Sequence, residues 1–326
     1  MTTAPGPELV VGVDSGGSGL RIALARAGDG TVLETVSSRE PVRTGTGGID
    51  AGHLAGQVVP AVDAMVGRAG GGRVVSVAVG AAGMATLGDR LRAELPGALE
   101  RAWGVRRLAL AADAVTAYAG ALGQRPGVVV AGGTGLIAIG TDLSGWRRAD
   151  GWGHLLGDCG SGAWIGRAGL EAAMRAYDGR RGGSAALLSR AEELFGPAAG
   201  LPGVLYPRTD RPAVLASFAP EVAGCAVAGD PVATEILERA AGHVAEAAAA
   251  VSPSGVGVEV ALTGGLFAMG RALLGPLRQE LAVLLPEARE VAAAGDPLAG
   301  AVTVAGALAE GTLRLPEDPL LLRVAR

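Results

Sequence analysis

Asp14 and the glycine-rich turn after it are the first residues whose types and spacing could do chemistry. The segment Leu9–Ala25 reads LVVGVDSGGSGLRIALA, in which one apolar run ends at Asp14 and a second follows the turn. Glycines let backbone N–H groups approach a ligand, and successive N–H groups bind anions. Because Asp14 would repel a phosphate, we expect a water-bound Mg²⁺ between them. An ordinary tight hairpin with a chance aspartate is the alternative.

A second stretch, Gly127–Gly140, repeats this pattern. It reads GVVVAGGTGLIAIG, so that its GGTGL turn matches the GGSGL turn of the first stretch. A third glycine pair ends the apolar run of Val258–Phe267, VEVALTGGLF. Two similar halves with hydroxyl-bearing turns indicate a duplicated α/β unit that holds phosphate between its halves. The chain has 55 glycines, so glycine at strand ends without a ligand is the alternative.

Asp113 stands between an expected strand and an expected helix. The apolar run Arg107–Ala112 predicts a buried strand, and Ala114–Leu122 predicts a helix directly after it. Ligands of open α/β sheets lie beyond the carboxyl ends of the strands. A carboxylate there can accept the proton of a hydroxyl that attacks a phosphoryl group. The alternative is that Asp113 only caps the helix.

The segment Trp146–Gly162, WRRADGWGHLLGDCGSG, is too rich in glycine for one regular element. Asp158 could bind the hydroxyls of a polyol, and Trp152 could stack on a sugar face. The alternatives are a turn aspartate at position 158, because aspartate favours turns, and core packing of Trp152. Asp142 and Asp150 are expected to be solvated turn residues.

The elements that must position these residues alternate between strands and helices, which predicts a largely parallel α/β architecture. The length of 326 residues favours two domains, because single cores usually stop growing below that size. A capping aspartate and a proline predict the start of a helix at Pro231–Val251. Asp296–Glu310 predicts a closing helix whose small residues must pack tightly.

Composition excludes several classes of protein. The net charge of −4 provides no basic field for nucleic acid. All 28 basic residues are arginine, so the chain has neither a Walker A lysine nor a lysine nucleophile. Its two cysteines, Cys159 and Cys225, have the spacing of neither a disulfide framework nor a CxxC metal site. The start MTTAPGPE lacks the features of a secretion signal, and no uncharged apolar run reaches the roughly 20 residues that span a membrane, so we expect a cytoplasmic protein with no membrane or nucleic-acid partner.

Five segments resemble, in the same order, those of the N-acetylglucosamine kinases and the BadF/BadG/BcrA/BcrD ATPase family, within the actin–hexokinase superfamily. They are DSGGSGLR at Asp14–Arg21, AADA at Ala111–Ala114, GGTG at Gly132–Gly135, GWGHLLGDCGS at Gly151–Ser161 and TGGLF at Thr263–Phe267. The resemblance spans nearly the whole chain, and the GWGHLLGDCGS segment is its most specific part.

The resemblance implies an α/β fold of two RNase H-like domains with ATP in an interdomain cleft. The expected domains are residues 1–117 and 118–326, and the last helix, at about 296–311, is a candidate to pack back on the N-terminal domain. ATP and Mg²⁺ are the implied cofactors, with Asp14 as the metal-binding residue. A homodimer is expected.

The implied activity is that of an ATP:sugar phosphotransferase acting on N-acetylglucosamine. Asp113 matches the catalytic base that takes the proton from the 6-hydroxyl of the sugar. The residues implied to bind ATP and its phosphates are Asp14, Gly16, Gly17, Ser18, Gly133, Thr134, Gly264 and Gly265. The residues implied beside the sugar are Asp113, Thr134, Gly151, Trp152 and Asp158.

The departures from the family pattern all fall on the sugar side. Cys159 stands where the family usually has glutamate, and Ala82-Gly83 replaces a Ser-Gly-Gly turn. The loop RTGTGGID at Arg43–Asp50 has no asparagine to bind sugar. Glucosamine, another amino sugar or a cyclitol is therefore an alternative acceptor. An ATP-driven activator with a cysteine-bound iron–sulfur cluster and a non-catalytic sugar sensor are alternatives of other classes.

Overall fold

The computed structural model describes residues 6–17, 19–45, 48–254 and 257–325. Contacts divide the chain into two compact units, which are described one at a time. Unit 1 consists of the described residues of 1–126, 141–146 and 292–326, and unit 2 consists of those of 127–140 and 147–291. Residues 118–126 and the C-terminal segment therefore belong to the same unit as the N-terminal strands.

Unit 1 contains a sheet in the order β13-β7-β6-β1-β2-β3 and a small hairpin, β4-β5. The strands are β1 (Glu8–Gly16), β2 (Gly19–Arg26), β3 (Val32–Ser38), β4 (Thr44–Gly45), β5 (Gly48–Ile49), β6 (Arg73–Ala81), β7 (Arg107–Ala112) and β13 (Leu322–Ala325). The helices are α1 (Ala51–Arg68), α2 (Met84–Leu87), α3 (Asp89–Trp103), α4 (Asp113–Leu122) and α12 (Pro297–Glu310).

The parallel part of this sheet is its middle. Strand β6 runs parallel to both β1 and β7, whereas β1–β2, β2–β3 and β7–β13 are antiparallel. The expectation of a largely parallel sheet was therefore wrong for unit 1. The turns between β1 and β2 and between β2 and β3 are too short for the crossover of a dozen or more residues that parallel neighbours need.

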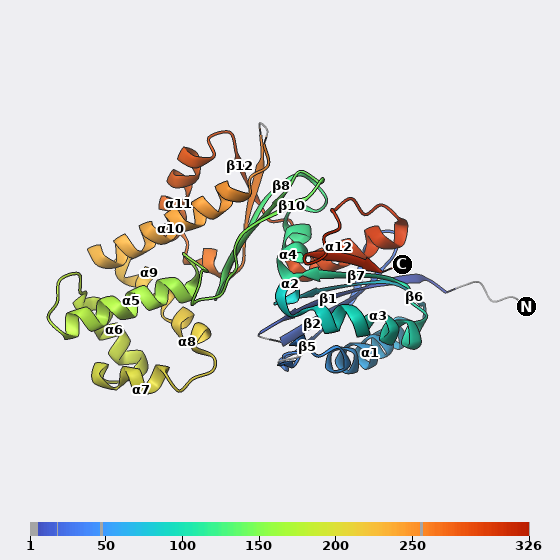
Figure 1. Cartoon of the computed structure of the whole chain (residues 1–326), viewed down its shortest axis with the longest axis horizontal. Coiled ribbons are helices and arrows are strands. Elements are labelled where there is room, and N and C mark those ends of the chain that lie inside the picture. Colours follow the sequence, from blue (N-terminus) through green and yellow to red (C-terminus); the bar gives the residue numbers. More distant parts are fainter. Residues whose placement is uncertain (1–5, 18, 46–47, 255–256, 326) are drawn as a thin grey trace, which may run out of the picture. The chain divides into compact units, whose positions relative to one another are not determined.

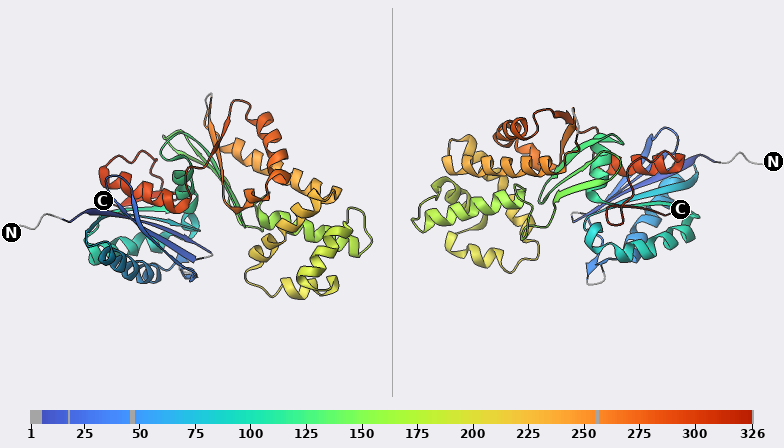
Figure 2. Two further views of the ribbon diagram at one scale, coloured as in Figure 1. Left: turned by 180° about the vertical axis from the view of Figure 1, so that it is seen from behind. Right: turned by 45° about the horizontal axis from the view of Figure 1, so that its top comes forward.

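Helices cover both faces of the unit 1 sheet (Figure 1). Helices α12 and α4 lie on one face, and α1 and α3 lie on the other, as the views in Figure 2 also show. Strand β1 lies in the middle of the sheet, and its residues Leu9, Val10, Val11 and Val13 are fully buried. A strand that is covered on both faces has this near-continuous apolar sequence.

Helix α12 approaches its neighbours through positions that lack side chains. A Cβ atom at Gly300 would lie 1.8 Å from the carbonyl oxygen of Thr116 in α4. A Cβ atom at Gly12 in β1 would lie 2.7 Å from the amide nitrogen of Val302. The small residues of this helix thus permit close backbone packing, as predicted. The helix does not close the chain, however, because β13 follows it and pairs with β7.

Unit 2 contains a sheet in the order β10-β9-β8-β11-β12, in which β8 and β11 are parallel. The strands are β8 (Gly127–Gly132), β9 (Leu136–Thr141), β10 (Trp146–Asp150), β11 (Glu259–Thr263) and β12 (Arg289–Ala292). The helices are α5 (Gly162–Tyr177), α6 (Ala185–Phe195), α7 (Leu201–Leu205), α8 (Arg211–Ser217), α9 (Ala219–Val227), α10 (Pro231–Val251) and α11 (Arg271–Leu284), with 3₁₀ turns η1 (Ala198–Gly200) and η2 (Gly265–Met269).

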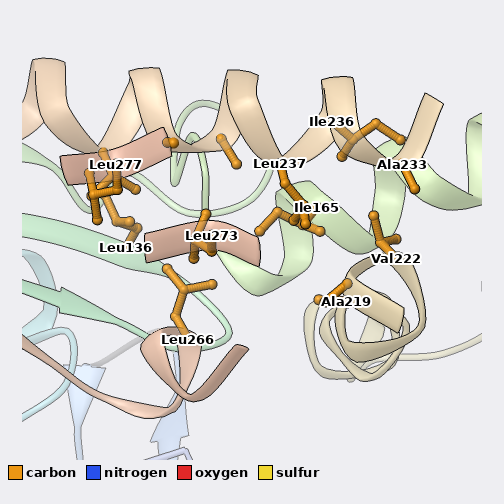
Figure 3. Close-up of a cluster of buried hydrophobic side chains, with 14 of the residues drawn as sticks. Leu136, Ile165, Ala219, Val222, Ala233, Ile236, Leu237, Leu266, Leu273 and Leu277 are labelled. Carbon is orange, nitrogen blue, oxygen red and sulfur yellow. The ribbon is translucent and has the colours of Figure 1, made fainter. Parts of the chain in front are cut away.

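The core of unit 2 joins the sheet to its helices (Figure 3). Leu136 of β9, Ile165 of α5 and Leu237 of α10 belong to one buried cluster. Leu266 and Leu273 extend the same cluster from η2 into α11. Leu266 comes directly after the third glycine pair, so burial of its side chain fixes the position of that pair.

Helix α10 has the bounds that its sequence predicts. Asp230 caps it by accepting a hydrogen bond from the amide of Ala233, and Pro231 is its first residue. Over the residues the structure describes, no single helix is both long and apolar enough to cross a membrane. The segments Arg211–Val227 and Pro231–Val251 have the length and composition only as a pair bent by 119°.

Replacing Gly300 with alanine should destabilise unit 1, because the methyl group would overlap the Thr116 carbonyl and push α12 away from α4. Overpacking of this kind costs about 1–3 kcal/mol. A Cβ atom at Gly306 on the same helix would meet no described atom within 4 Å, so Gly306→Ala should stabilise the helix by about 0.5–1 kcal/mol. Thermal unfolding measures both effects, and a G300A melting temperature at or above that of the wild type would contradict the packing described.

Candidate functional site

Asp14 and Asp113 lie at the same edge of the unit 1 sheet. Asp14, near the carboxyl end of β1, is in register with Gly80 of β6, which is in register with Ala111 of β7. Asp113 follows two residues after Ala111, as the first residue of α4. Since neighbouring strands are about 4.7–4.9 Å apart, β1 and β7 are separated by about 10 Å. The parallel pairing therefore brings the metal candidate and the base candidate to one side of the unit.

Arg21 holds the Asp14 carboxylate across the first hairpin. Its Nε and Nη2 donate to Oδ2 of Asp14 at 3.0 and 2.7 Å, and its Nη1 donates to Oδ2 of Asp296 at 2.5 Å. Asp296 also accepts a hydrogen bond from the amide of Ala299 and thereby caps α12. Arg21 was not among the residues predicted for the site, although the antiparallel register of a tight hairpin places it opposite Asp14.

Asp113 is partly buried at the start of α4. Its Oδ1 accepts a hydrogen bond from the amide of Ala114 at 2.9 Å, and its carbonyl accepts one from the Thr116 hydroxyl at 3.0 Å. The N-cap position belongs to Ala112, so the alternative that Asp113 is the cap was wrong. The positive end of the helix dipole lies at this first turn.

The second glycine turn and the third glycine pair meet at one edge of the unit 2 sheet. Thr263 of β11 is in register with Ala131 of β8, so Gly264 and Gly132 follow at the same level. A Cβ atom at Gly264 would lie 2.2 Å from the Gly132 carbonyl oxygen, and Gly264 has φ = +98°. Glycine is therefore required at position 264 by the fold itself.

Four of the glycines implied to bind ATP have open space around them. A Cβ atom added to any of these four would meet no described atom within 4 Å, and none has a left-handed φ; they are Gly16, Gly17, Gly133 and Gly265. The fold does not require glycine there, and the space that a side chain would fill is available to a ligand. Ser18, implied to bind phosphate in the first turn, lies outside the described residues.

Two backbone amides at the start of helix α5 bind the second glycine turn. The amide of Gly162 donates to the carbonyl of Gly133 at 2.9 Å, and the amide of Ala163 donates to that of Thr134 at 3.1 Å. The amide of Gly133 donates to the carbonyl of Gly135 within the turn at 2.8 Å. These bonds fix the turn conformation through the backbone and leave the Thr134 side chain exposed.

Asp158 lies against this second turn. Its Oδ1 accepts a hydrogen bond from the amide of Gly153 at 3.1 Å, and a Cβ atom at Gly135 would lie 2.6 Å from its Oδ2. The residue is only 8% exposed. Burial raises the pKa of the Asp158 carboxyl, and the negative charge of Asp150 raises it further. The group is a hydrogen-bonding carboxylate in a confined place, which suits recognition of hydroxyl groups.

Trp152 is exposed, so the alternative that it packs in the core was wrong. Its exposed fraction is 61%, and the guanidinium of Arg148 lies 4.1 Å from the centroid of its ring. Arg148 also donates to the carbonyls of Asp150 and Gly151. Gly151 has φ = +75°, and a Cβ atom there would overlap the Ile137 side chain. The indole is thus held by a cation–π contact at the surface.

Asp150 is not the solvated turn residue that the sequence suggested. Its Oδ1 accepts a hydrogen bond from the amide of Asp158 at 2.5 Å, and its Oδ2 accepts one from the amide of Cys159 at 2.8 Å. Asp142, by contrast, bonds to Ser144 within an exposed turn, as expected. The available signal was an aspartate just before a glycine-rich loop, where such side chains bond to backbone N–H groups.

Burial, with the charges of Asp150 and Asp158, raises the pKa of the Cys159 thiol, which disfavours a reactive thiolate.

Asp14 suits Mg²⁺ as a single carboxylate rather than as part of a cluster. Among the described residues, no group of three or more His, Cys, Asp or Glu side chains could hold a metal ion. Mg²⁺ is commonly bound by one or two carboxylates together with waters and substrate phosphates. A role of Asp14 toward Mg²⁺ therefore depends on phosphate oxygens that a nucleotide brings.

Comparison with known proteins adds a family and a fold. A model of the BadF/BadG/BcrA/BcrD ATPase family matches residues 11–307. An N-acetylmuramic acid/N-acetylglucosamine kinase from Clostridium acetobutylicum is 44% identical over 69 residues, or 21% of this chain. That match spans 22% of the length of the relative.

Solved structures share the fold over nearly the whole chain. A protein from Chromobacterium violaceum, designated a candidate N-acetylglucosamine kinase, is 30% identical with a TM-score of 0.69, over 91% of this chain and 99% of that one. A ROK family glucokinase from Streptomyces griseus, in complex with glucose and AMPPNP, is 23% identical with a TM-score of 0.53, over 91% and 98%. These likenesses confirm the α/β fold of the actin–hexokinase type that the sequence predicted.

Stability should respond to pH in opposite ways at Asp158 and Asp142. Because the folded-state pKa of Asp158 is raised, its ionisation opposes folding, and this cost grows as pH rises above the unfolded-state pKa of about 3.9. Asp158→Asn should therefore gain stability relative to the wild type between about pH 4 and pH 7.

Asp142 provides the matched control for this prediction. Its bonds with Ser144 lower the pKa of its carboxyl, so its charged form supports folding and this support is lost as pH falls. Asp142→Asn should therefore lose stability relative to the wild type as pH rises through the range below the unfolded-state pKa of about 3.9, with little further change above about pH 5. Denaturant unfolding of both variants at several pH values measures the two trends, and trends of the same sign would refute the assignment.

Proposed function

Because this chain belongs to the BadF/BadG/BcrA/BcrD ATPase family, we propose that it is an ATP-dependent sugar kinase. The proposed reaction transfers the γ-phosphoryl group of ATP to the 6-hydroxyl of N-acetylglucosamine, with Asp113 as the general base. The observation that carries the proposal is the open space around glycines in turns at strand ends, which are Gly16, Gly17, Gly133 and Gly265. Successive backbone N–H groups in such turns bind phosphate.

In this proposal the two glycine turns bind the polyphosphate of ATP. Gly16, Gly17 and Ser18 supply the first set of donors, and Gly133 with Thr134 supplies the second. Gly264 and Gly265 flank the adenosine. Mg²⁺ held near Asp14 would offset the negative charge of the phosphates when bound. The burial of Leu266 and the contact of Gly264 with Gly132 support a fixed backbone on the adenosine side.

Asp113 acts on the attacking hydroxyl. As the sugar oxygen forms its bond to the γ-phosphorus, the bond from that phosphorus to the ADP oxygen breaks and the hydroxyl proton passes to the Asp113 carboxylate. Two features support this role for Asp113: its place at the end of β7 and its position in the first turn of α4, at the positive end of the helix dipole.

The acceptor is proposed from the side chains of the Gly151–Cys159 loop. Asp158 would accept hydrogen bonds from sugar hydroxyls, and the exposed ring of Trp152 would contact the sugar face. N-acetylglucosamine is favoured because two of the three similar proteins described above carry that name. Cys159 and the lack of any asparagine in the chain favour a second candidate, glucosamine or another amino sugar or cyclitol, because fewer polar groups are left for an acetamido group.

Replacing Asp113 with asparagine should lower sugar phosphorylation by about 10²–10⁴-fold, because the amide cannot take the proton. Its oxygen can still accept the Ala114 N–H bond, so ATP binding should be unchanged. A coupled assay of ADP release and a direct titration with ATP measure the two effects. Asp89→Asn is the matched control, since Asp89 also begins a helix of unit 1 and its side chain is 99% exposed. Full turnover by D113N would rule out the base role.

Replacing Gly133 with alanine should weaken ATP binding without destabilising the protein. The methyl group meets no described atom within 4 Å, so only a ligand would be obstructed. We expect the KM for ATP to rise about tenfold, the equivalent of about 1.4 kcal/mol. Gly224→Ala, another position of unit 2 with open space, is the control and should leave this KM unchanged. An unchanged ATP KM in G133A would count against phosphate binding at this turn.

The acceptor is tested by incubating the protein with ATP, Mg²⁺ and a panel of hexoses, amino sugars and cyclitols. The proposal expects the highest kcat/KM for N-acetylglucosamine and a 6-phosphate product, which mass spectrometry and NMR identify. A higher value for glucosamine or a cyclitol would select the second candidate. ATP binding with no phosphorylated product from any acceptor would overturn the kinase proposal.

A further inference from the structure

We propose that Asp150 is a positioning residue of the acceptor site: its carboxylate holds the Gly151–Cys159 loop in place and thereby fixes the Asp158 carboxylate beside the second glycine turn. The role rests on the proposed function insofar as the acceptor binds at Asp158. The holding of the loop itself is a property of the protein without substrate, and it can be measured separately.

Both oxygens of the Asp150 carboxylate are used within the loop. Oδ1 accepts the amide proton of Asp158, and Oδ2 accepts that of Cys159. Asp150 ends β10, so a residue of the sheet fixes the far end of the glycine-rich loop. Hydrogen bonds to a charged group are roughly twice as strong as those between neutral groups. Without the carboxylate, the two amides would lose these acceptors.

The loop is built around this carboxylate. A Cβ atom at Gly157 would lie 2.4 Å from Oδ1 of Asp150, so a side chain at position 157 would displace the acceptor. Asp150 itself has φ = +61°, and Asp158 has φ = +53°, conformations that few non-glycine residues adopt. Strained backbone of this kind persists where surrounding contacts hold it in place.

A second side chain of β10 secures the near end of the loop. Arg148 donates from Nε to the Asp150 carbonyl at 3.1 Å and from Nη2 to the Gly151 carbonyl at 3.0 Å. The same guanidinium lies over Trp152. The near end is therefore fixed by a cation and the far end by an anion, both from one strand.

These contacts at the two ends of the loop determine where the Asp158 side chain lies. With its own amide bonded to Asp150, its carboxylate lies beside Gly135 and accepts the Gly153 amide. Bringing two carboxylates this close is unfavourable. The hydrogen bonds of the loop keep the two carboxylates close despite this repulsion. The Asp158 carboxylate therefore faces the second glycine turn rather than solvent. Asp150 touches neither sugar nor nucleotide in this scheme, so it acts through Asp158.

The first test uses hydrogen–deuterium exchange on the full chain without ligands. In Asp150→Asn, which has one acceptor oxygen in place of two, the amides of Asp158 and Cys159 should exchange about tenfold faster, the factor for about 1.4 kcal/mol. Peptides from β8 and β9 should keep their protection. Asp142→Asn is the matched control, because Asp142 lies in an exposed turn after the neighbouring strand β9 and should leave the loop unchanged. Unchanged exchange at Asp158 and Cys159 in D150N would overturn the proposal.

The second test separates positioning from general damage. With N-acetylglucosamine, ATP and Mg²⁺, D150N should raise the KM for the sugar about tenfold while leaving the KM for ATP unchanged. Asp150→Glu keeps two acceptor oxygens and should recover part of the sugar affinity; it also serves if the asparagine variant fails to fold. Equal increases in both KM values would overturn the positioning role. Faster loop exchange in D150N, together with a wild-type protein that phosphorylates no sugar, would support the holding of the loop and refute the proposed kinase function.

Discussion

Parallel strands that end at a common edge of each sheet bring the candidate site residues together. In unit 1, β6 aligns β1 with β7 and so brings Asp14 and Asp113 to one side of the sheet. In unit 2, β8 aligns with β11 and brings Gly132 beside Gly264. A shift of one residue in either pairing would turn every side chain of the strand to the opposite face of the sheet and move these residues out of line. The hydrophobic core therefore sets the positions of the strand ends that carry these residues.

Each candidate carboxylate is held by groups that the fold supplies. Arg21 binds Asp14 and Asp296 at once, which uses the fork of donors that arginine has and lysine lacks. Asp158 is buried and relies on the Gly153 amide, a case in which burial of a charge must be offset by hydrogen bonds. Such fixed carboxylates can meet a ligand without reorganising, which is the condition for selective binding of polar groups.

The sequence predicted the elements that local signals define. The first hairpin, the strand Arg107–Ala112 and the helix capped by Asp230 all follow from turn glycines, apolar runs and cap residues that lie close together in the chain. The pairing of β13 with β7, by contrast, joins segments about two hundred residues apart and has no local signal. The Arg21–Asp296 bond was not predicted for the same reason. The bonds of Asp150 lie within a short segment, but the loop conformation that brings the Asp158 and Cys159 amides to its carboxylate is irregular and follows no simple sequence pattern.

The glycines of the two proposed binding regions differ in a way that bears on specificity. In the acceptor loop they are required by the fold: Gly151, Gly153 and Gly160 have left-handed φ, and Gly157 leaves room for Asp150. On the proposed nucleotide side the fold requires glycine at position 264 but imposes no such need at Gly16, Gly17, Gly133 and Gly265. In the proposed site the glycine turns bind the nucleotide mainly through backbone groups, whose positions change little with sequence. The backbone of the acceptor loop cannot adapt its conformation to a ligand in the same way, because its left-handed glycines and the contact between Gly157 and Asp150 require one conformation. Discrimination between acceptors must then come from side chains on a fixed loop, and a substitution such as cysteine at position 159 can change the acceptor without changing the fold.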